Sequence, residues 1–433
     1  MTNPGRINRA TVTAAFLSVF LTACGGGGGS SGDRIFIPSA PVNVQAVAAD
    51  QQNTVSWDRV DGATEYTVYW NDVGGVTDSD NVITSVNISQ TTHTGLLNGQ
   101  IYYYRVEALA GSQSSGLSDS TGLGTPLASS TTDSLLDIAW NRAKRLVAVA
   151  ESGSVIAGKI VENLDGTGTT LLWEPPLQPT TEVLGGVAWN GRVFLAVGGG
   201  GTVLSSTDGV NWSNPVTGTA PDADLNAVTR WIDNRFVAVG ASGRIFVSDD
   251  AEASSWTESN PTRVGETLQD IVWNGVAPPQ EGEDDPLVDA LVTVGNNGTV
   301  LTSTDGLNWN NRTQASKTTN ALGAIVWGRG KYVATGTSGT VITSPDGRLW
   351  TERVSGTDTS FFGLTYWPQR QLFAAVGASG GLLTSPDALG FWKRVRSGTE
   401  KQLNSVLPLV TETDTYLVTV GSGGTILTHQ REP

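Results

Sequence analysis

The chain has 433 residues, and its composition favours short strands joined by tight turns. It contains 53 glycines and 14 tryptophans, while charged residues make up 15%, against roughly 25% in an average globular protein. Glycine weakens helix interiors, so this composition excludes a coiled coil or a helical bundle. The formal net charge of -15 creates repulsion towards nucleic-acid phosphates. We therefore expect an all-β protein with no nucleic-acid partner.

The rarest residue types narrow the chemistry further. Cys24 is the only cysteine, which excludes an intrachain disulfide, a thiolate zinc site and a Cys-ligated iron–sulfur cluster. His93 and His429 are the only histidines, too few for a polyhistidine metal site, and a Ser-His-Asp triad would need one of them. We expect no metal, no cofactor and no enzyme activity.

Residues 1–23 have the charge and hydropathy pattern of a secretory signal peptide. Arg6 and Arg9 precede an apolar run over residues 14–21, which is too short for a membrane-spanning helix. The segment ends in Leu21-Thr22-Ala23-Cys24, which resembles the lipobox of bacterial lipoproteins. This resemblance implies cleavage before Cys24 and acylation of that residue. The acyl chains alone are sufficient to hold a protein at a membrane.

Residues 24–37 then contain the acylated cysteine and a tether, because residues 25–32 are glycine and serine only. Gly25 stands where an aspartate would retain such a lipoprotein at the inner membrane, so the resemblance implies the outer membrane. We expect a protein that is lipid-anchored in a bacterial envelope, on the periplasmic or the surface side.

Residues 38–126 show period-two alternation broken by turn residues, which predicts antiparallel strands. The pattern is clearest around Val55–Trp57, over Ala63–Trp70 and over Ile101–Val106. These segments resemble a fibronectin type III domain, with Trp57 as its buried tryptophan and Tyr102 as its corner tyrosine. The resemblance implies a two-sheet sandwich, a domain that most often serves as a spacer.

Residues 127–433 contain a repeat that decides the architecture. Each unit begins with an apolar strand such as Leu268–Trp273 and continues with a second such as Phe236–Gly240. A glycine opens each third strand, at Gly153, Gly201, Gly243, Gly298, Gly339, Gly380 and Gly424. We predict a seven-bladed β-propeller of four-stranded blades, in which neighbouring blades cover each other's faces. The seventh unit lacks its fourth strand, so residues 127–133 are predicted to complete it.

The third and fourth strands are joined by a recurring motif, Ser-x-Asp-Gly followed by a tryptophan. Its aspartates are Asp208, Asp305 and Asp346, with a looser copy at Asp387. The motif resembles the Asp-box (BNR) repeat of sialidase-like propellers, and the longer unit resembles the photosystem II assembly-factor type of propeller. We interpret the box as structural, because a short aspartate accepts backbone N–H bonds in a turn and glycine takes a positive φ. The resemblance implies an outer-rim position, away from the ligand.

Candidate binding residues are those predicted to gather at the propeller mouth. They are Asp137, Asn226, Gln269 and Asn404 near the start of innermost strands, and Asn296 and Asn297 in a turn. Amide side chains suit the holding of a ligand without its transformation, so we expect a non-enzymatic binding or assembly module with a protein partner. The alternative is a carbohydrate-active protein, either a sialidase-like glycosidase or a glycan-binding lectin. No Arg-Ile-Pro segment of the sialidase type occurs.

An acidic loop in the fourth unit is the remaining candidate for metal binding. It runs over Glu281–Asp289, and clustered carboxylates of this kind suit Ca²⁺. The spacing matches no EF-hand, and we favour a solvated acidic loop over a calcium site.

Overall fold

The computed structural model describes residues 36–49, 52–72, 75–96, 101–119, 121–124, 131–162, 169–259, 264–276, 289–411 and 415–429. The described chain has 34 strands, one short helix, α1 (Thr313–Ser316), and six 3₁₀ turns, which confirms the all-β prediction. The predicted signal peptide and Cys24 lie outside the described residues. Within the described ranges, no helix has the length and apolar character needed to cross a bilayer.

Residues 45–124 form two antiparallel sheets with a shared apolar core. One sheet has the order β1-β2-β5 and the other β4-β3-β6-β7, with β8 also pairing with β6. The strands are β1 (Gln45–Ala49), β2 (Gln52–Ser56), β3 (Glu65–Asn71), β4 (Asn81–Val86), β5 (Gln90–Thr94), β6 (Ile101–Ala110), β7 (Gln113–Leu117) and β8 (Thr121–Gly124). Trp57 is buried in the core, edge-on to Tyr66 at 5.2 Å between ring centroids.

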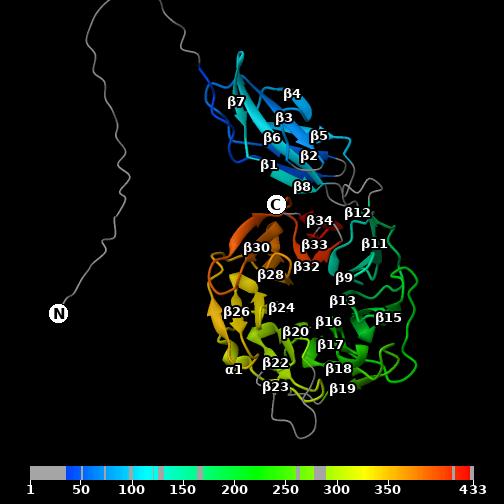
Figure 1. Ribbon diagram of the computed structural model, residues 1–433. Coiled ribbons are helices and arrows are strands. Elements are labelled where there is room, and N and C mark those ends of the chain that lie inside the picture. The colour runs from blue at the N-terminus through cyan, green and yellow to red at the C-terminus, as the bar shows by residue number, and fades with distance from the viewer. Residues whose placement is uncertain are drawn as a thin grey trace, which may run out of the picture. The chain divides into compact units, whose positions relative to one another are not determined.

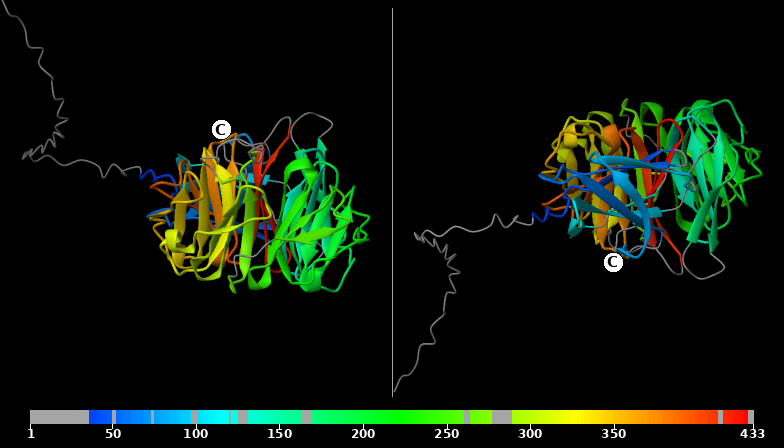
Figure 2. Two further views of the ribbon diagram at one scale, coloured as in Figure 1. Left: turned by 90° about the horizontal axis from the view of Figure 1, so that it is seen from below. Right: turned by 90° about the horizontal axis from the view of Figure 1, so that it is seen from above.

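Residues 135–429 form seven further antiparallel sheets around a common axis, counted over the described chain (Figure 1). Figure 2 shows the same sheets from two sides. Sheet 1 comprises β9 (Leu135–Trp140), β10 (Arg145–Ala150), β11 (Val155–Glu162) and β12 (Thr169–Trp173); sheet 2 comprises β13 (Leu184–Trp189), β14 (Phe194–Gly198) and β15 (Val203–Ser206). Sheet 3 comprises β16 (Leu225–Arg230), β17 (Phe236–Gly240), β18 (Ile245–Ser248) and β19 (Trp256–Glu258); sheet 4 comprises β20 (Leu268–Trp273), β21 (Leu291–Gly295), β22 (Val300–Ser303) and β23 (Asn310–Asn311).

The last three sheets continue the series in chain order. Sheet 5 comprises β24 (Leu322–Gly328), β25 (Lys331–Gly336), β26 (Val341–Ser344) and β27 (Thr351–Arg353). Sheet 6 comprises β28 (Phe361–Trp367), β29 (Leu372–Gly377), β30 (Gly381–Ser385) and β31 (Lys393–Arg396), and sheet 7 comprises β32 (Leu403–Val410), β33 (Thr415–Gly421) and β34 (Thr425–His429). The first strand of each sheet lies innermost and contacts the innermost strand of the next sheet.

The second strand of each sheet is apolar on both faces, because a neighbouring sheet covers each face. In β17, Phe236 and Ala238 pack with sheet 2, while Val237 and Val239 pack with sheet 4. Burying one such Val or Phe side chain stabilises the fold by about 1.5–3 kcal/mol. Alternate side chains of β17 still point to opposite faces. Because both faces are buried, however, the sequence shows a continuous apolar run, Phe-Val-Ala-Val-Gly, and no alternation of polar and apolar residues.

The glycine before most third strands is required by close backbone contact. The 3₁₀ turns η1 (Gly199–Gly201), η3 (Ala241–Gly243), η4 (Asn296–Gly298), η5 (Thr337–Gly339) and η6 (Ala378–Gly380) each end in such a glycine, and η2 (Ile232–Asn234) lies elsewhere, within sheet 3. Gly298 has φ 66°, and a Cβ on it would overlap the carbonyl oxygen of Thr318. A residue with a side chain would be strained there both by its conformation and by this contact.

The ring of sheets closes by packing of sheet 7 against sheet 1. Asn404 Nδ2 donates to the carbonyl oxygen of Leu135 at 2.8 Å, and Ser405 Oγ donates to Asp137 Oδ1 at 2.8 Å. The prediction that residues 127–133 add a fourth strand is not met in its described part. Residues 131–133 form no strand, residues 127–130 lie outside the described chain, and sheet 7 has three described strands. In the described chain, sheets 7 and 1 are joined by these side-chain bonds, by apolar packing between the two sheets and by a backbone bond from Gly424 N–H to the carbonyl oxygen of Asp133 at 2.7 Å.

Candidate functional site

Each innermost strand begins with a β-bulge, and the seven bulges form a ring at one end of the axis. The register with the second strand skips one residue in every sheet. The skipped residues, here called bulge residues, are Leu136, Gly185, Asn226, Gln269, Gly323, Phe362 and Asn404. A bulge redirects a side chain out of the regular pleat, so these positions share one environment.

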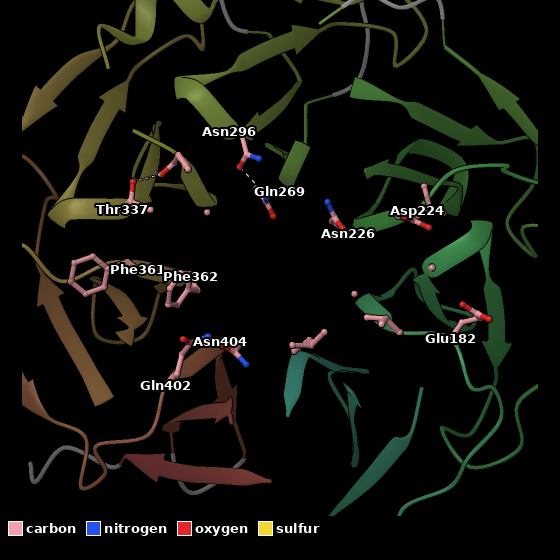
Figure 3. Close-up of a pocket in the computed structure, with 17 residues that line it drawn as sticks. Glu182, Asp224, Asn226, Gln269, Asn296, Thr337, Phe361, Phe362, Gln402 and Asn404 are labelled. Atoms are coloured by element: carbon pink, nitrogen blue, oxygen red, sulfur yellow. Dashed lines mark hydrogen bonds between the residues drawn. The ribbon is translucent and has the colours of Figure 1, made fainter. Parts of the chain in front are cut away.

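The bulge residues line a cavity of about 660 Å³, here called the mouth (Figure 3). It is lined by the seven bulge residues and by Glu182, Val183, Gly199, Asp224, Leu225, Asn296, Ala321, Thr337, Phe361 and Gln402. Five of these residues carry a side-chain amide, and two carry a carboxylate. Among the described lining residues there is no histidine, cysteine, tyrosine, lysine or arginine.

Asn226 and Asn404 each bond to a neighbouring sheet, whereas Gln269 and Gln402 each bond to an amide of their own repeat unit. Asn226 Nδ2 donates to the carbonyl oxygen of Leu268 at 2.8 Å, which joins sheet 3 to sheet 4. Gln269 Nε2 donates to Asn296 Oδ1 at 3.1 Å. Gln402 Nε2 donates to Asn404 Oδ1 at 2.7 Å. Within the described chain, the side-chain oxygens of two of these amides, Asn226 Oδ1 and Gln269 Oε1, accept no hydrogen bond, so they are available to a ligand.

Four of the six predicted mouth residues line the cavity. Asn226, Gln269, Asn296 and Asn404 do so, whereas Asp137 and Asn297 do not. The prediction for Asp137 is off by one residue, because Leu136 follows the first residue of its innermost strand, Leu135, as Asn226 follows Leu225. Asn297 occupies the second, left-handed position of η4 with φ 53° and is exposed, and the preceding Asn296 supplies the lining side chain.

Asp137 instead binds the innermost strands of sheets 2 and 7. Its carboxylate accepts hydrogen bonds from the backbone N–H of Val187 at 2.9 Å, from its own neighbour Ile138 and from Ser405. Asp270 occupies the equivalent position of sheet 4 and accepts the N–H of Ile325 at 2.8 Å. Burial outweighs these hydrogen bonds, so the pKa of Asp137 is raised and that of Asp270 is raised to about 7.

Sequence reasoning missed the remaining polar and aromatic lining residues. Glu182 and Asp224 stand just before β13 and β16, Gln402 stands just before β32, and Phe362 is a bulge residue. All four occupy the same region of the repeat as the predicted amides. Aligning the units on the leucine or phenylalanine that begins each innermost strand would have identified them.

The box aspartates form turns and do not line the mouth. Asp346 Oδ1 accepts the N–H groups of Arg348 and Leu349, and Ser344 Oγ donates to the same oxygen. Asp208 and Asp305 make equivalent bonds to their own turns. Burial raises the pKa of each of these three carboxyls, but the hydrogen bonds outweigh it and hold the pKa below the ordinary value.

The tryptophan of each regular box is also fixed by its turn. Trp350 Nε1 donates to the carbonyl oxygen of Gly347 at 2.9 Å, and Trp309 and Trp212 make the same bond to Gly306 and Gly209. In the looser box, Asp387 accepts the N–H of Leu389. The indole nitrogen of Trp392 there is buried without a partner in the described chain.

Asp289, the described end of the acidic loop, is engaged by arginine. Its Oδ1 accepts hydrogen bonds from Arg348 Nε at 3.1 Å and Nη2 at 2.9 Å, and Arg312 Nη2 lies 3.8 Å from Oδ2. This ion pair neutralises the one described carboxylate of the loop. The other acidic residues of the loop lie outside the described residues. In the described chain no group of three His, Cys, Asp or Glu residues is placed to hold a metal.

Comparisons with known proteins identify the fold. No family model matches the chain, and no curated protein matches it. YCF48 from Cyanidioschyzon merolae is 16% identical with a TM-score of 0.52, over 71% of this chain and 98% of its own. A YCF48 bound to D1 peptide is 16% identical with a TM-score of 0.50, over 70% and 95%. The WD40 β-propeller domain of Doa1 is 9% identical with a TM-score of 0.52, over 70% and 94%. Similarity at these identities shows the fold alone, and it confirms the predicted β-propeller.

Proposed function

We propose that this chain is a membrane-anchored, non-enzymatic binding module whose propeller mouth holds a segment of a protein partner. The observation that carries the proposal is the amide-lined cavity at one end of the ring. Side-chain amides both donate to and accept from peptide groups, and a ring of them suits an occupant with an exposed backbone. Similarity to YCF48, for which a structure with a bound D1 peptide exists, supports a protein segment as the occupant.

The finer architecture forms part of the same proposal. The seven sheets are the blades of one closed propeller, supported by the contacts between innermost strands and by the bond from Asn404 to Leu135. The two N-terminal sheets form a fibronectin type III domain, supported by their strand orders β1-β2-β5 and β4-β3-β6-β7. The Ser-x-Asp-Gly turns are Asp-boxes with a structural role, supported by their internal hydrogen bonds.

The composition of the mouth favours binding over catalysis. Its described lining contains the carboxylates Glu182 and Asp224 but no histidine, tyrosine or cysteine. Neither a nucleophile–base pair nor an arginine grip for a sugar carboxylate is assembled there. The two carboxylates are the one feature of this lining that a glycosidase would share, and both are exposed with no arginine beside them in the described lining.

The membrane anchor rests on the sequence. We expect Cys24→Ser to abolish incorporation of radiolabelled palmitate and to leave the precursor uncleaved, because the thiol is the acyl acceptor implied by the lipobox. Phe36→Ser, near the end of the tether segment, serves as the control and should be labelled normally. Unchanged labelling of the Cys24→Ser protein would contradict the anchor.

Site-directed photo-cross-linking tests occupancy of the mouth. Benzoylphenylalanine placed at Gln269 should yield one discrete protein adduct in living cells, because its side chain lines the cavity. The same probe at Glu352, an exposed residue of β27 outside the mouth, provides the control and should yield none. Adducts at neither position, or equal adducts at both, would contradict a protein-binding mouth.

A further inference from the structure

The mouth has an uneven charge distribution. Its charged lining residues in the described chain are Glu182 and Asp224, both acidic and both exposed. They precede the innermost strands of the neighbouring sheets 2 and 3: Glu182 lies two residues before Leu184, and Asp224 lies one residue before Leu225. Neither forms an ion pair within the described residues, so their negative charge faces the cavity uncompensated.

Both carboxylates flank the same turn, η1. The N–H of Gly200 donates to Asp224 Oδ1 at 2.7 Å. Glu182 Oε2 lies 3.3 Å from the position that a Cβ on Gly199 would occupy. The turn consists of glycine only, and a Cβ on Gly200 would meet nothing within 4 Å. The corresponding turns of other sheets carry Ala, Asn, Thr or Ser, so η1 alone among them leaves the space between two carboxylates free of side chains.

The opposite side of the mouth carries an aromatic ring, with the amides Gln402 and Asn404 beside it (Figure 3). Phe362 is the half-buried bulge residue of sheet 6, which lies across the ring from sheets 2 and 3. Figure 3 shows Phe362 on one side of the cavity and Asp224 and Glu182 on the other, with Asn226 and Gln269 along the edge between them. The carbonyl oxygens of these two amides are open acceptors, so the cavity between the acidic and aromatic sides favours hydrogen-bond donors.

We propose that the mouth binds an extended peptide segment that places a lysine or arginine side chain between Glu182 and Asp224 and an apolar side chain on Phe362. This inference rests on the proposed function and specifies the chemistry of its partner. Ammonium and guanidinium groups are donors without acceptors, which matches two carboxylates beside open amide oxygens. The chain's formal net charge of -15 favours encounter with a basic partner, and the binding weakens as salt rises.

Selection from a phage-displayed library of random dodecapeptides on the purified full-length chain tests this proposal. We expect selected peptides to contain lysine or arginine together with an apolar residue. The isosteric double variant Glu182→Gln/Asp224→Asn should bind a selected peptide roughly tenfold more weakly, since two cation–carboxylate contacts are lost. The control Glu352→Gln/Asp358→Asn removes the same charge at exposed positions outside the mouth and should bind as the wild type does.

The possible outcomes separate this proposal from the proposed function. Selected peptides without basic residues, whose binding is lost in Phe362→Ala but unchanged in Glu182→Gln/Asp224→Asn, would overturn the basic-peptide inference and leave the binding mouth intact. Equal weakening by the mouth and control double variants would show a general charge effect and would also overturn it. Failure to select any peptide that depends on mouth residues would overturn both proposals.

Discussion

The indole hydrogen bond of the box tryptophans can be isolated by comparing two boxes of the same propeller. Trp350 and Trp392 are both buried, with 2% and 6% of their surface exposed, and each packs between its own sheet and the preceding one. The indole of Trp350 donates to the carbonyl oxygen of Gly347, whereas that of Trp392 has no partner in the described chain. The looser box has one residue more between its aspartate and its tryptophan, which removes the register needed for the bond.

Substitution by phenylalanine removes the same atoms at both positions. The loss of packed ring volume is therefore similar and largely cancels in the comparison. At Trp350 the substitution also leaves the carbonyl oxygen of Gly347 without its donor, which costs about 1–3 kcal/mol when the group is buried. At Trp392 the substitution removes an unpaired buried N–H and so relieves a penalty. We expect Trp350→Phe to lower the free energy of unfolding by roughly 1–3 kcal/mol more than Trp392→Phe.

Urea unfolding of the full-length variants, followed by far-ultraviolet circular dichroism at neutral pH, measures this difference. Trp309→Phe provides a replicate, because Trp309 donates to the carbonyl oxygen of Gly306 at 3.0 Å in a box with the same spacing. It should resemble Trp350→Phe. Equal losses at all three positions, or a larger loss at Trp392, would refute the reasoning that the Asp-box turn fixes the indole through this bond.

Other predictions concern backbone conformation and buried ionisable groups. Gly306→Ala should lower the free energy of unfolding by about 1–2 kcal/mol because of the positive φ at that position. Gly298→Ala should lower it clearly more, because a Cβ at Gly298 would also collide with backbone atoms. Equal urea midpoints of the two variants would contradict this prediction. Burial lowers the pKa of His429 to about 4, so wild-type stability is lost as pH falls from 6.5 to 4, and His429→Gln should flatten this limb of a stability–pH curve. Burial raises the pKa of Asp270 to about 7, so the stability that its protonated form contributes is lost as the pH rises from about 4 to 7. Asp270→Asn should remove this decrease in stability. An unchanged slope of the stability–pH curve between about pH 4 and 7 would contradict the prediction.

Local sequence determined the repeat, the turns and the boxes. A glycine with positive φ, as at Gly298, or an aspartate that caps its own turn, as Asp346 does, acts over a few residues. Such features are readable without knowledge of the fold, because their hydrogen-bond partners are neighbours in the chain. The apolar run Phe236–Gly240 likewise predicted a strand covered on both faces. The all-β class and the β-propeller followed from these signals together.

Only the tertiary structure decided which side chains meet at the mouth. Alignment of the repeats makes Leu136 the equivalent of Asn226, but it does not reveal that a bulge at this position turns the side chains towards a common cavity. The ion pair between Asp289 and Arg348 and the bond from Asn404 to Leu135 join residues 59 and 269 positions apart. Such contacts depend on how neighbouring sheets pack around the ring. A bulge changes the direction of a side chain and needs no particular residue type at that position. Which side chains line the mouth is therefore decided only when the seven sheets pack around the ring.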